Sequence, residues 1–212
     1  LFPYTTLFRS AAGLVLLFAP HFHPILRNVA EIRKSLGVRT IFNILGPLLN
    51  PAPLTHQVMG VFDPGMAPLV ANVLLALGRD RGMVISGHGG FDELSLSGPN
   101  RLVLFSEEGV REAVITPEEA GLARRGDDEF LGGTATENAA IIEDILAGKK
   151  GGPRDVVLLN ASAVFLVSGM ASSWKEGVAL ASESIDSGRA AEVLEKIRSF
   201  SQQREDVIPR SA

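Results

Sequence analysis

The stretch HQVMGVFDPGMAPLVANVLLALGRDRGMVIS, residues 56–86, decides the fold class. Residues 56–62 alternate in polarity, which is typical of a strand with one buried face. Residues 66–77 carry apolar side chains at i, i+3, i+4 and i+7 spacing, which indicates a helix packed against a core. A second apolar strand is expected at residues 83–86. Strand, helix and strand of these lengths predict a βαβ unit with two parallel strands.

Downstream of this unit, residues 101–105 and 110–116 read as two more strands. Residues 155–167, DVVLLNASAVFLV, are ambiguous on pattern alone. Their valines favour a buried strand, whereas the length of the run favours a helix. Residues 189–202 form an amphipathic pattern that predicts a terminal helix.

Upstream, residues 24–37 predict a helix that begins at Pro24 and ends at Gly37. Arg33 falls inside the apolar arc of this helix, between Leu26 and Val29. A guanidinium costs free energy when desolvated unless it has an anionic or hydrogen-bonding partner. The alternative is an arginine whose methylenes cover apolar surface while its charge reaches water, and helix geometry alone favours that alternative.

Composition limits the class of protein. The 212 residues are 46% hydrophobic, which supports a full core and one or two domains and argues against disorder. The net charge of −4 and the lack of a Lys/Arg run argue against a nucleic-acid partner. The absence of cysteine excludes disulfides and thiolate metal sites and fits a reducing compartment, so a cytoplasmic location is expected. The apolar run at residues 11–20 is too short to span a bilayer, and no membrane partner is expected.

Asp92 and Glu93 form the first candidate site. They follow a glycine-rich segment, residues 87–90, at the carboxyl end of an expected parallel strand, where open α/β sheets bind ligands. Two adjacent carboxylates offer the oxygen ligands that hard divalent cations prefer. On composition alone, two solvated carboxylates in a turn are the simpler interpretation.

A second glycine-rich segment, Gly132-Gly133-Thr134, permits two readings. Helix N-termini can bind phosphate, but Thr134 and Glu137 have the spacing of a capping box, which explains the segment without a ligand. His23 and His88 are candidates for acid/base roles, and an ordinary packed or exposed imidazole is the alternative for each.

The strings FAPHFHP, VAEIRKSLGVRTIFNILGP and NPA in residues 18–52, with GGFDELS at residues 89–95, resemble anthranilate phosphoribosyltransferases. The resemblance extends from about Gly13 to the C-terminus. It implies an α/β fold, in which a nucleoside phosphorylase/phosphoribosyltransferase-like large domain has a central, mostly parallel sheet flanked by helices. A remnant of the family's small helical domain is expected beside it, and a buried helix at residues 155–167.

The resemblance also assigns site residues. The arginine that matches Arg33 contacts the carboxylate of anthranilate in that family. The pair that matches Asp92 and Glu93 binds Mg²⁺ on phosphoribosyl pyrophosphate. The family has His and Asp where this chain has Ser86 and Gly89, which leaves the hydrogen bonding of the loop open. Asn138 and Asn160 also match family positions, and we assign them structural roles.

The implied activity is Mg²⁺-dependent transfer of the phosphoribosyl group to the amine of anthranilate, a step of tryptophan biosynthesis that needs no protein nucleophile. The family's upstream donor-binding segments do not occur in this chain. We therefore expect a C-terminal fragment that is inactive alone, from an enzyme that forms homodimers. The expected organisation is an unassigned, non-native leader at residues 1–12, whose first ten residues have no counterpart in the family pattern, a hinge and helical-domain remnant at 13–52, the α/β domain at 53–205 and a tail at 206–212.

Two rival classes share parts of this pattern. A pyrimidine-nucleoside phosphorylase-like enzyme would share the fold, but Asp92 and Glu93 favour the transferase. A non-catalytic, nucleic-acid-binding relative would need a basic groove, which an isoelectric point near 5.6 disfavours. A structural fragment without present activity is compatible with the same ancestry.

Overall fold

The computed structural model describes residues 10–17, 22 and 42–205, and the chain divides into two compact units. One unit holds residues 52–186, and the other holds the two ends of the chain. Within the second unit, α5 spans Phe42–Leu48 and α10 spans Arg189–Glu205. The helix predicted at residues 24–37, with Arg33, lies outside the described residues.

A four-stranded sheet in the order β1-β2-β3-β4 forms the centre of the 52–186 unit. β1 and β2 are parallel, with Val58 opposite Met83, as the βαβ pattern predicts. The other two pairings, β2 with β3 and β3 with β4, are antiparallel. The strands are β1 (His56–Gly60), β2 (Arg81–Ser86), β3 (Asn100–Ser106) and β4 (Gly109–Ile115).

The prediction of a mostly parallel sheet is therefore wrong for the described strands, although the α/β class is confirmed. The physical reason lies in the connections. Parallel neighbours need a crossover of a dozen or more residues, usually a helix. A short turn joins β3 to β4, and the segment between β2 and β3 contains only the short 3₁₀ helix η2 (His88–Gly90).

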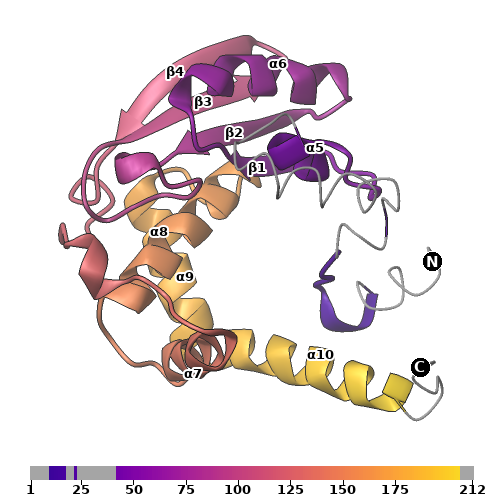
Figure 1. Cartoon of the computed structure of the whole chain (residues 1–212), viewed down its shortest axis with the longest axis vertical. Helices are drawn as coiled ribbons and strands as arrows, with labels where there is room; N and C mark the ends of the chain where they lie inside the picture. The colour runs from indigo at the N-terminus through magenta and orange to yellow at the C-terminus, as the bar shows by residue number, and fades with distance from the viewer. Residues whose placement is uncertain (1–9, 18–21, 23–41, 206–212) are drawn as a thin grey trace, which may run out of the picture. The chain divides into compact units, whose positions relative to one another are not determined.

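Helices cover both faces of this sheet (Figure 1). α6 (Ala67–Ala76) packs against β2 and β3, while α8 (Gly152–Val167) packs against β1 and β2 and α9 (Trp174–Asp186) packs on α8. α8 shows that the ambiguous run at residues 155–167 is a helix, as expected from the family. α7 (Ala135–Leu146) is the remaining helix of the described part of this unit.

The start of α6 follows from its sequence. The carboxylate of Asp63 accepts a hydrogen bond from the N–H of Gly65 at 2.9 Å, and the short 3₁₀ helix η1 (Pro64–Met66) leads into α6. Gly78 ends the helix in the left-handed region at φ +80°, a conformation that glycine adopts without strain. The βαβ unit is thus built by the capping residues that the sequence displays.

The core on the α8 side of the sheet includes residues from outside the helices and strands, among them two leucines. Leu94 and Leu96, from the segment between β2 and β3, are fully buried against Ile85 of β2 and Leu159 of α8. Burial of leucine side chains on this scale contributes about 1.5–3 kcal/mol each. The segment that carries Asp92 and Glu93 is therefore anchored in the core directly after the acidic pair.

α8 and α9 are joined by close packing and by a buried arginine. A Cβ at Gly177 would lie 2.7 Å from the Cβ of Ser162, so glycine permits the close approach. Arg154 is 1% exposed and donates to Ser182 Oγ at 2.7 Å and to Asp186 Oδ2 at 2.8 Å. The hydrogen bond from Arg154, with smaller contributions from those of Ser182 and Lys150, lowers the pKa of Asp186 to about 2.

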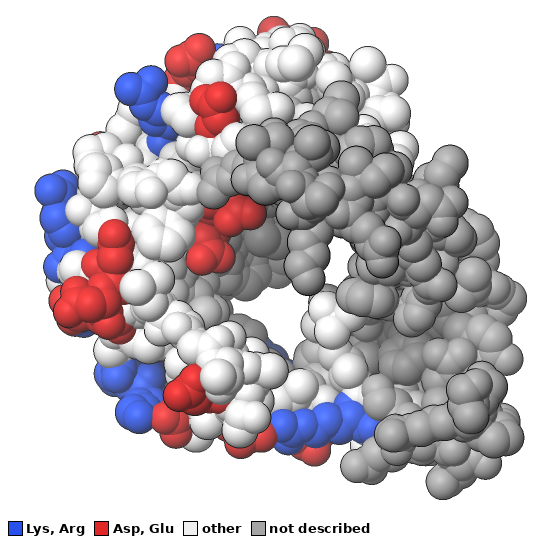
Figure 2. Space-filling view, in the orientation of Figure 1, with Lys and Arg blue, Asp and Glu red and all other residues white. Residues whose placement is uncertain are grey.

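Within the described residues, no helix combines the length and apolar character that a membrane crossing requires. Acidic and basic side chains are interspersed over the face of the described residues that Figure 2 shows.

Candidate functional site

Asp92 and Glu93 lie across the carboxyl ends of β1 and β2. A Cβ on Gly60, the last residue of β1, would overlap the carbonyl oxygen of Asp92. A Cβ on Gly87, the residue after β2, would overlap the carbonyl oxygen of Glu93. The two glycines therefore leave room for the backbone of the acidic pair, and the structure places the pair at the edge of the sheet that the sequence predicted.

The glycine-rich segment before the pair reverses the direction of the chain. Gly89 and Gly90 both adopt the left-handed region, at φ +78° and +83°. The N–H of Gly87 donates to the carbonyl oxygen of Phe91 at 2.8 Å and closes the turn. Because glycine tolerates positive φ, this sequence can return from the end of β2 across the tips of the strands.

The carboxylates of Asp92 and Glu93 are exposed, and within the described residues neither forms an ion pair. The carboxyl of Glu93 is nevertheless partly desolvated, which raises its pKa, and the neighbouring charge of Asp92 raises it further. A cation near both oxygens would offset this repulsion. The local electrostatics thus favour a positively charged ligand at the pair.

The donor set fits Mg²⁺ shared with a phosphate ligand. The described residues contain no group of three or more His, Cys, Asp or Glu side chains placed to hold a metal. Mg²⁺ usually keeps several waters and binds through one or two carboxylates together with substrate phosphates. Two exposed carboxylates without a third ligand among the described side chains are compatible with that mode.

The two histidines singled out by sequence have different outcomes. His23 lies outside the described residues. The backbone N–H of His88 donates to Asn100 Oδ1 at 3.2 Å, and its ring covers Gly98, where a Cβ would lie 2.5 Å from Nδ1. The ring of His88 thus has a packing role, and an acid/base role stays a prediction.

The second glycine-rich segment forms the capping box that the sequence predicts. Thr134 Oγ1 accepts from the N–H of Glu137 at 3.3 Å, and Glu137 Oε2 accepts from the N–H of Thr134 at 2.7 Å. The N–H of Gly133 donates to Asn138 Oδ1 at 2.8 Å. These backbone donors are already satisfied by the start of α7, which favours the cap over a phosphate loop.

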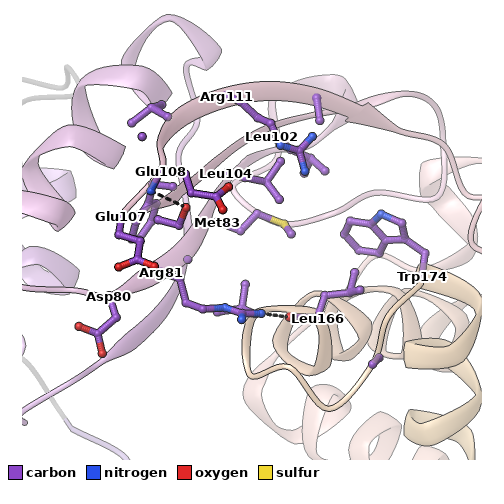
Figure 3. A pocket seen from close by; sticks show the side chains of 18 of the residues that line it. Asp80, Arg81, Met83, Leu102, Leu104, Glu107, Glu108, Arg111, Leu166 and Trp174 are labelled. Atoms are coloured by element: carbon purple, nitrogen blue, oxygen red, sulfur yellow. Dashed lines mark hydrogen bonds between the residues drawn. The ribbon is translucent and has the colours of Figure 1, made fainter.

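A separate groove of about 970 Å³ lies at the opposite end of β2, between the β3–β4 hairpin and the end of α8 (Figure 3). Met83, Leu104 and Trp174 form apolar walls. Arg81 also lines the groove. Its guanidinium donates to the carbonyl oxygen of Leu166 at 2.7 Å and so already binds the end of α8. The rim carries both signs of charge, from Asp80, Arg81, Glu107, Glu108 and Arg111. This groove is not part of the candidate site.

Comparisons with known proteins agree with the resemblance read from the sequence. The model of the family described as "Glycosyl transferase family, a/b domain" matches residues 7–191. An anthranilate phosphoribosyltransferase of Syntrophomonas wolfei is 42% identical over 193 residues, which are 91% of this chain and 57% of that protein.

Two solved structures of the Saccharomyces cerevisiae anthranilate phosphoribosyltransferase are similar to the chain. One, in complex with 4-fluoroanthranilate, matches with a TM-score of 0.83 and 32% identity, over 89% of this chain and 55% of that one. The other, in complex with PRPP and Mg, matches with a TM-score of 0.76 and 31% identity, over 82% of this chain and 50% of that one. The chain spans about half the length of these relatives.

Proposed function

The chain belongs to the glycosyl transferase family, a/b domain, and on that premise we propose that the protein transfers a phosphoribosyl group to anthranilate. The donor is phosphoribosyl pyrophosphate, and the products are N-(5-phosphoribosyl)anthranilate and pyrophosphate. Because the chain spans about half of its relatives, the proposal concerns the whole protein of which these residues are a part. The relatives' names, and the two ligand complexes of the yeast enzyme, support it.

The observation that carries the proposal is the position of Asp92 and Glu93 across the ends of β1 and β2. Pyrophosphate leaves with several negative charges, and Mg²⁺ would neutralise them. The two carboxylates would hold that ion at the edge of the sheet where α/β proteins bind ligands. The exposure of both carboxylates leaves them accessible to a metal that arrives with its phosphate ligand.

Arg33 would bind the acceptor. A guanidinium forms two parallel hydrogen bonds with a carboxylate, which fixes the plane of an aromatic acid. That orientation would present the amine of anthranilate to the anomeric carbon, and positioning of two substrates supplies a large part of the rate in such reactions. No protein nucleophile is required. We propose a cytoplasmic homodimer as the setting, as in the expectation from the sequence.

The test uses the full-length protein and the 212-residue chain side by side. Consumption of anthranilate, followed by its fluorescence, should require phosphoribosyl pyrophosphate and Mg²⁺ in the full-length protein, and the chain alone should be inactive. Asp92→Asn should lower kcat/KM by about 100-fold or more, because a bound metal supplies several kcal/mol of charge stabilisation. Glu137→Gln, in the cap of α7, is the matched control and should leave the rate unchanged.

Two results would overturn the proposal. One is a full-length protein that leaves anthranilate intact while it cleaves a pyrimidine nucleoside with phosphate, as the rival enzyme class would. The other is an Asp92→Asn variant with wild-type kinetics at limiting Mg²⁺.

A further inference from the structure

Asn160 of α8 forms two hydrogen bonds with the backbone of Leu94, the residue directly after the acidic pair. Asn160 Oδ1 accepts from the N–H of Leu94 at 2.9 Å, and Asn160 Nδ2 donates to the carbonyl oxygen of the same residue at 2.8 Å. Nδ2 also donates to the carbonyl oxygen of Val156 at 2.9 Å, which fixes the amide to its own helix. Asn160 therefore ties the backbone next to Glu93 to a rigid element 66 residues away in sequence.

A second asparagine holds the two sides of the same loop together. Asn100, at the start of β3, has no exposed surface. Its Oδ1 accepts from the N–H of Ser95 at 2.7 Å and from the N–H of His88 at 3.2 Å. Its Nδ2 donates to the carbonyl oxygen of Ser95 at 3.0 Å. The segment between His88 and Ser95, which contains the acidic pair, is thus closed at its base by one side chain.

We propose that Asn160 and Asn100 are positioning residues, which hold the backbone of Asp92 and Glu93 so that both carboxylates can bind one divalent cation. This inference rests on the proposed function, because it assigns the acidic pair a metal. Neither asparagine needs to contact the ion. Each acts by removing freedom from the loop that carries the ligands.

The physical argument concerns the cost of ordering. The carboxylates of Asp92 and Glu93 are exposed, and no described cation pairs with them, so their side chains do not hold the loop in place. Fixing the backbone of one residue costs about 1–2 kcal/mol. We call the hydrogen bonds from Asn160 and Asn100 to this loop the clamp. Because the clamp orders the loop during folding, metal binding does not have to supply the free energy of that ordering. Groups that support metal ligands typically change affinity by about 10–100-fold when removed.

The chain offers a matched control in Asn138. Asn138 Oδ1 accepts from the N–H of Gly133 at 2.8 Å, and Asn138 Nδ2 donates to the carbonyl oxygen of the same residue at 3.2 Å. This amide makes the same pair of bonds to one backbone residue as Asn160 does to Leu94. It serves the start of α7 and not the acidic pair, so its removal should cost stability without affecting the metal.

The experiment measures Mn²⁺ binding to the 212-residue chain by electron paramagnetic resonance, with the metal alone and with inorganic pyrophosphate. Asn160→Ala, the milder Asn160→Ser, Asn138→Ala and Asp92→Asn are compared with the wild type. Thermal midpoints and ¹⁵N relaxation of residues 91–95 are recorded for each variant. The expected result is an affinity about tenfold weaker for Asn160→Ala, with faster backbone motion at residues 91–95, while Asn138→Ala keeps the wild-type affinity.

The possible results distinguish two proposals: that Asp92 and Glu93 bind a metal, and that the clamp positions them for it. If the wild type binds Mn²⁺ and Asp92→Asn does not, the metal site stands, and equal affinities of Asn160→Ala and Asn138→Ala then overturn the clamp alone. If the wild type binds no Mn²⁺ under either condition, the metal role and the clamp both fail. If both Asn160 variants are unfolded at the assay temperature, Asn160 is a residue of general stability and the clamp is overturned.

Discussion

The 52–186 unit contains two glycine-rich segments that each lead to a glutamate, at residues 87–93 and 132–137, and they have opposite characters. In the second, Glu137 accepts from the backbone N–H and the hydroxyl of Thr134, and these bonds lower its pKa. In the first, burial and the charge of Asp92 raise the pKa of Glu93. One carboxylate is therefore satisfied by its own helix, while the other lacks a partner among the described residues and suits an external cation.

The glycines beside the two segments also differ, in what a side chain at each position would meet. A Cβ on Gly60 or Gly87 would overlap the backbone of the acidic pair, which cannot move without disturbing the core at Leu94. The nearest atoms to a Cβ on Gly132 would all belong to the side chain of Asn138, with Oδ1 at 2.5 Å. In this chain, the loop whose backbone is packed against the sheet is the one whose carboxylates lack a partner among the described residues.

The largest expected effect is that of Gly60→Ala. The new methyl group would displace the carbonyl of Asp92, and overpacking of this kind costs about 1–3 kcal/mol. Urea unfolding should show the loss of stability, and Mn²⁺ titration should show weaker binding, because the acidic pair moves from the strand ends.

Gly132→Ala is the control for that change, because the obstructing atoms belong to the side chain of Asn138, which can move at the cost of its two hydrogen bonds to Gly133, and not to backbone. Its unfolding midpoint should fall less than that of Gly60→Ala, and its Mn²⁺ affinity should match the wild type. Equal effects of the two substitutions would remove the distinction between the loops.

The next effect compares Glu93, a proposed metal ligand, with Glu137, which caps α7. Glu93→Gln should weaken Mn²⁺ binding to the chain by about tenfold or more, since loss of a ligand should cost at least as much as loss of its support. Glu137→Gln should leave the affinity unchanged. Electron paramagnetic resonance with both variants checks this, and a loss of binding in Glu137→Gln would contradict the assignment of the metal to the first loop.

The smallest effect is the pH dependence of the cap. The pKa of Glu137 is lower in the folded chain than in the unfolded one, so its contribution to stability is present above the ordinary glutamate pKa, about 4.3. The contribution is lost as the pH falls through the folded pKa. Glu137→Gln should therefore unfold at lower urea than the wild type at pH 7, and this difference should shrink at low pH. If the difference in urea midpoint between the wild type and Glu137→Gln grows as the pH falls, the pKa of Glu137 is not lowered by folding and this prediction is wrong.

Local patterns were sufficient for much of this unit. The alternation at residues 56–62 and the apolar spacing at 66–77 predicted β1 and α6, and the parallel β1–β2 pair followed from the length of the crossover. Capping chemistry predicted the start of α7 from Thr134 and Glu137. In each case the deciding interactions join residues within a few positions of one another, so they are visible in one dimension.

The sheet and the clamp required more than local pattern. The antiparallel pairings of β3 depend on where the chain re-enters the sheet after residues 87–99. Asn100 gave no signal in the sequence, because an asparagine before a strand reads as an ordinary turn residue. Asn160 was correctly assigned to structure, but its partner Leu94 could not be identified from the spacing.

Residue order alone therefore established the family resemblance, the βαβ unit, the helix caps and the acidic pair near a strand end. Folding in three dimensions established that Gly60 and Gly87 lie beneath that pair and that Asn160 holds the residue after it. The division has one physical cause. Helix caps and hydrophobic periodicity depend on residues that are close in sequence. The space available at Gly60 and Gly87, and the hydrogen-bond partner of Asn160, depend on segments that are distant in sequence and are brought together by packing.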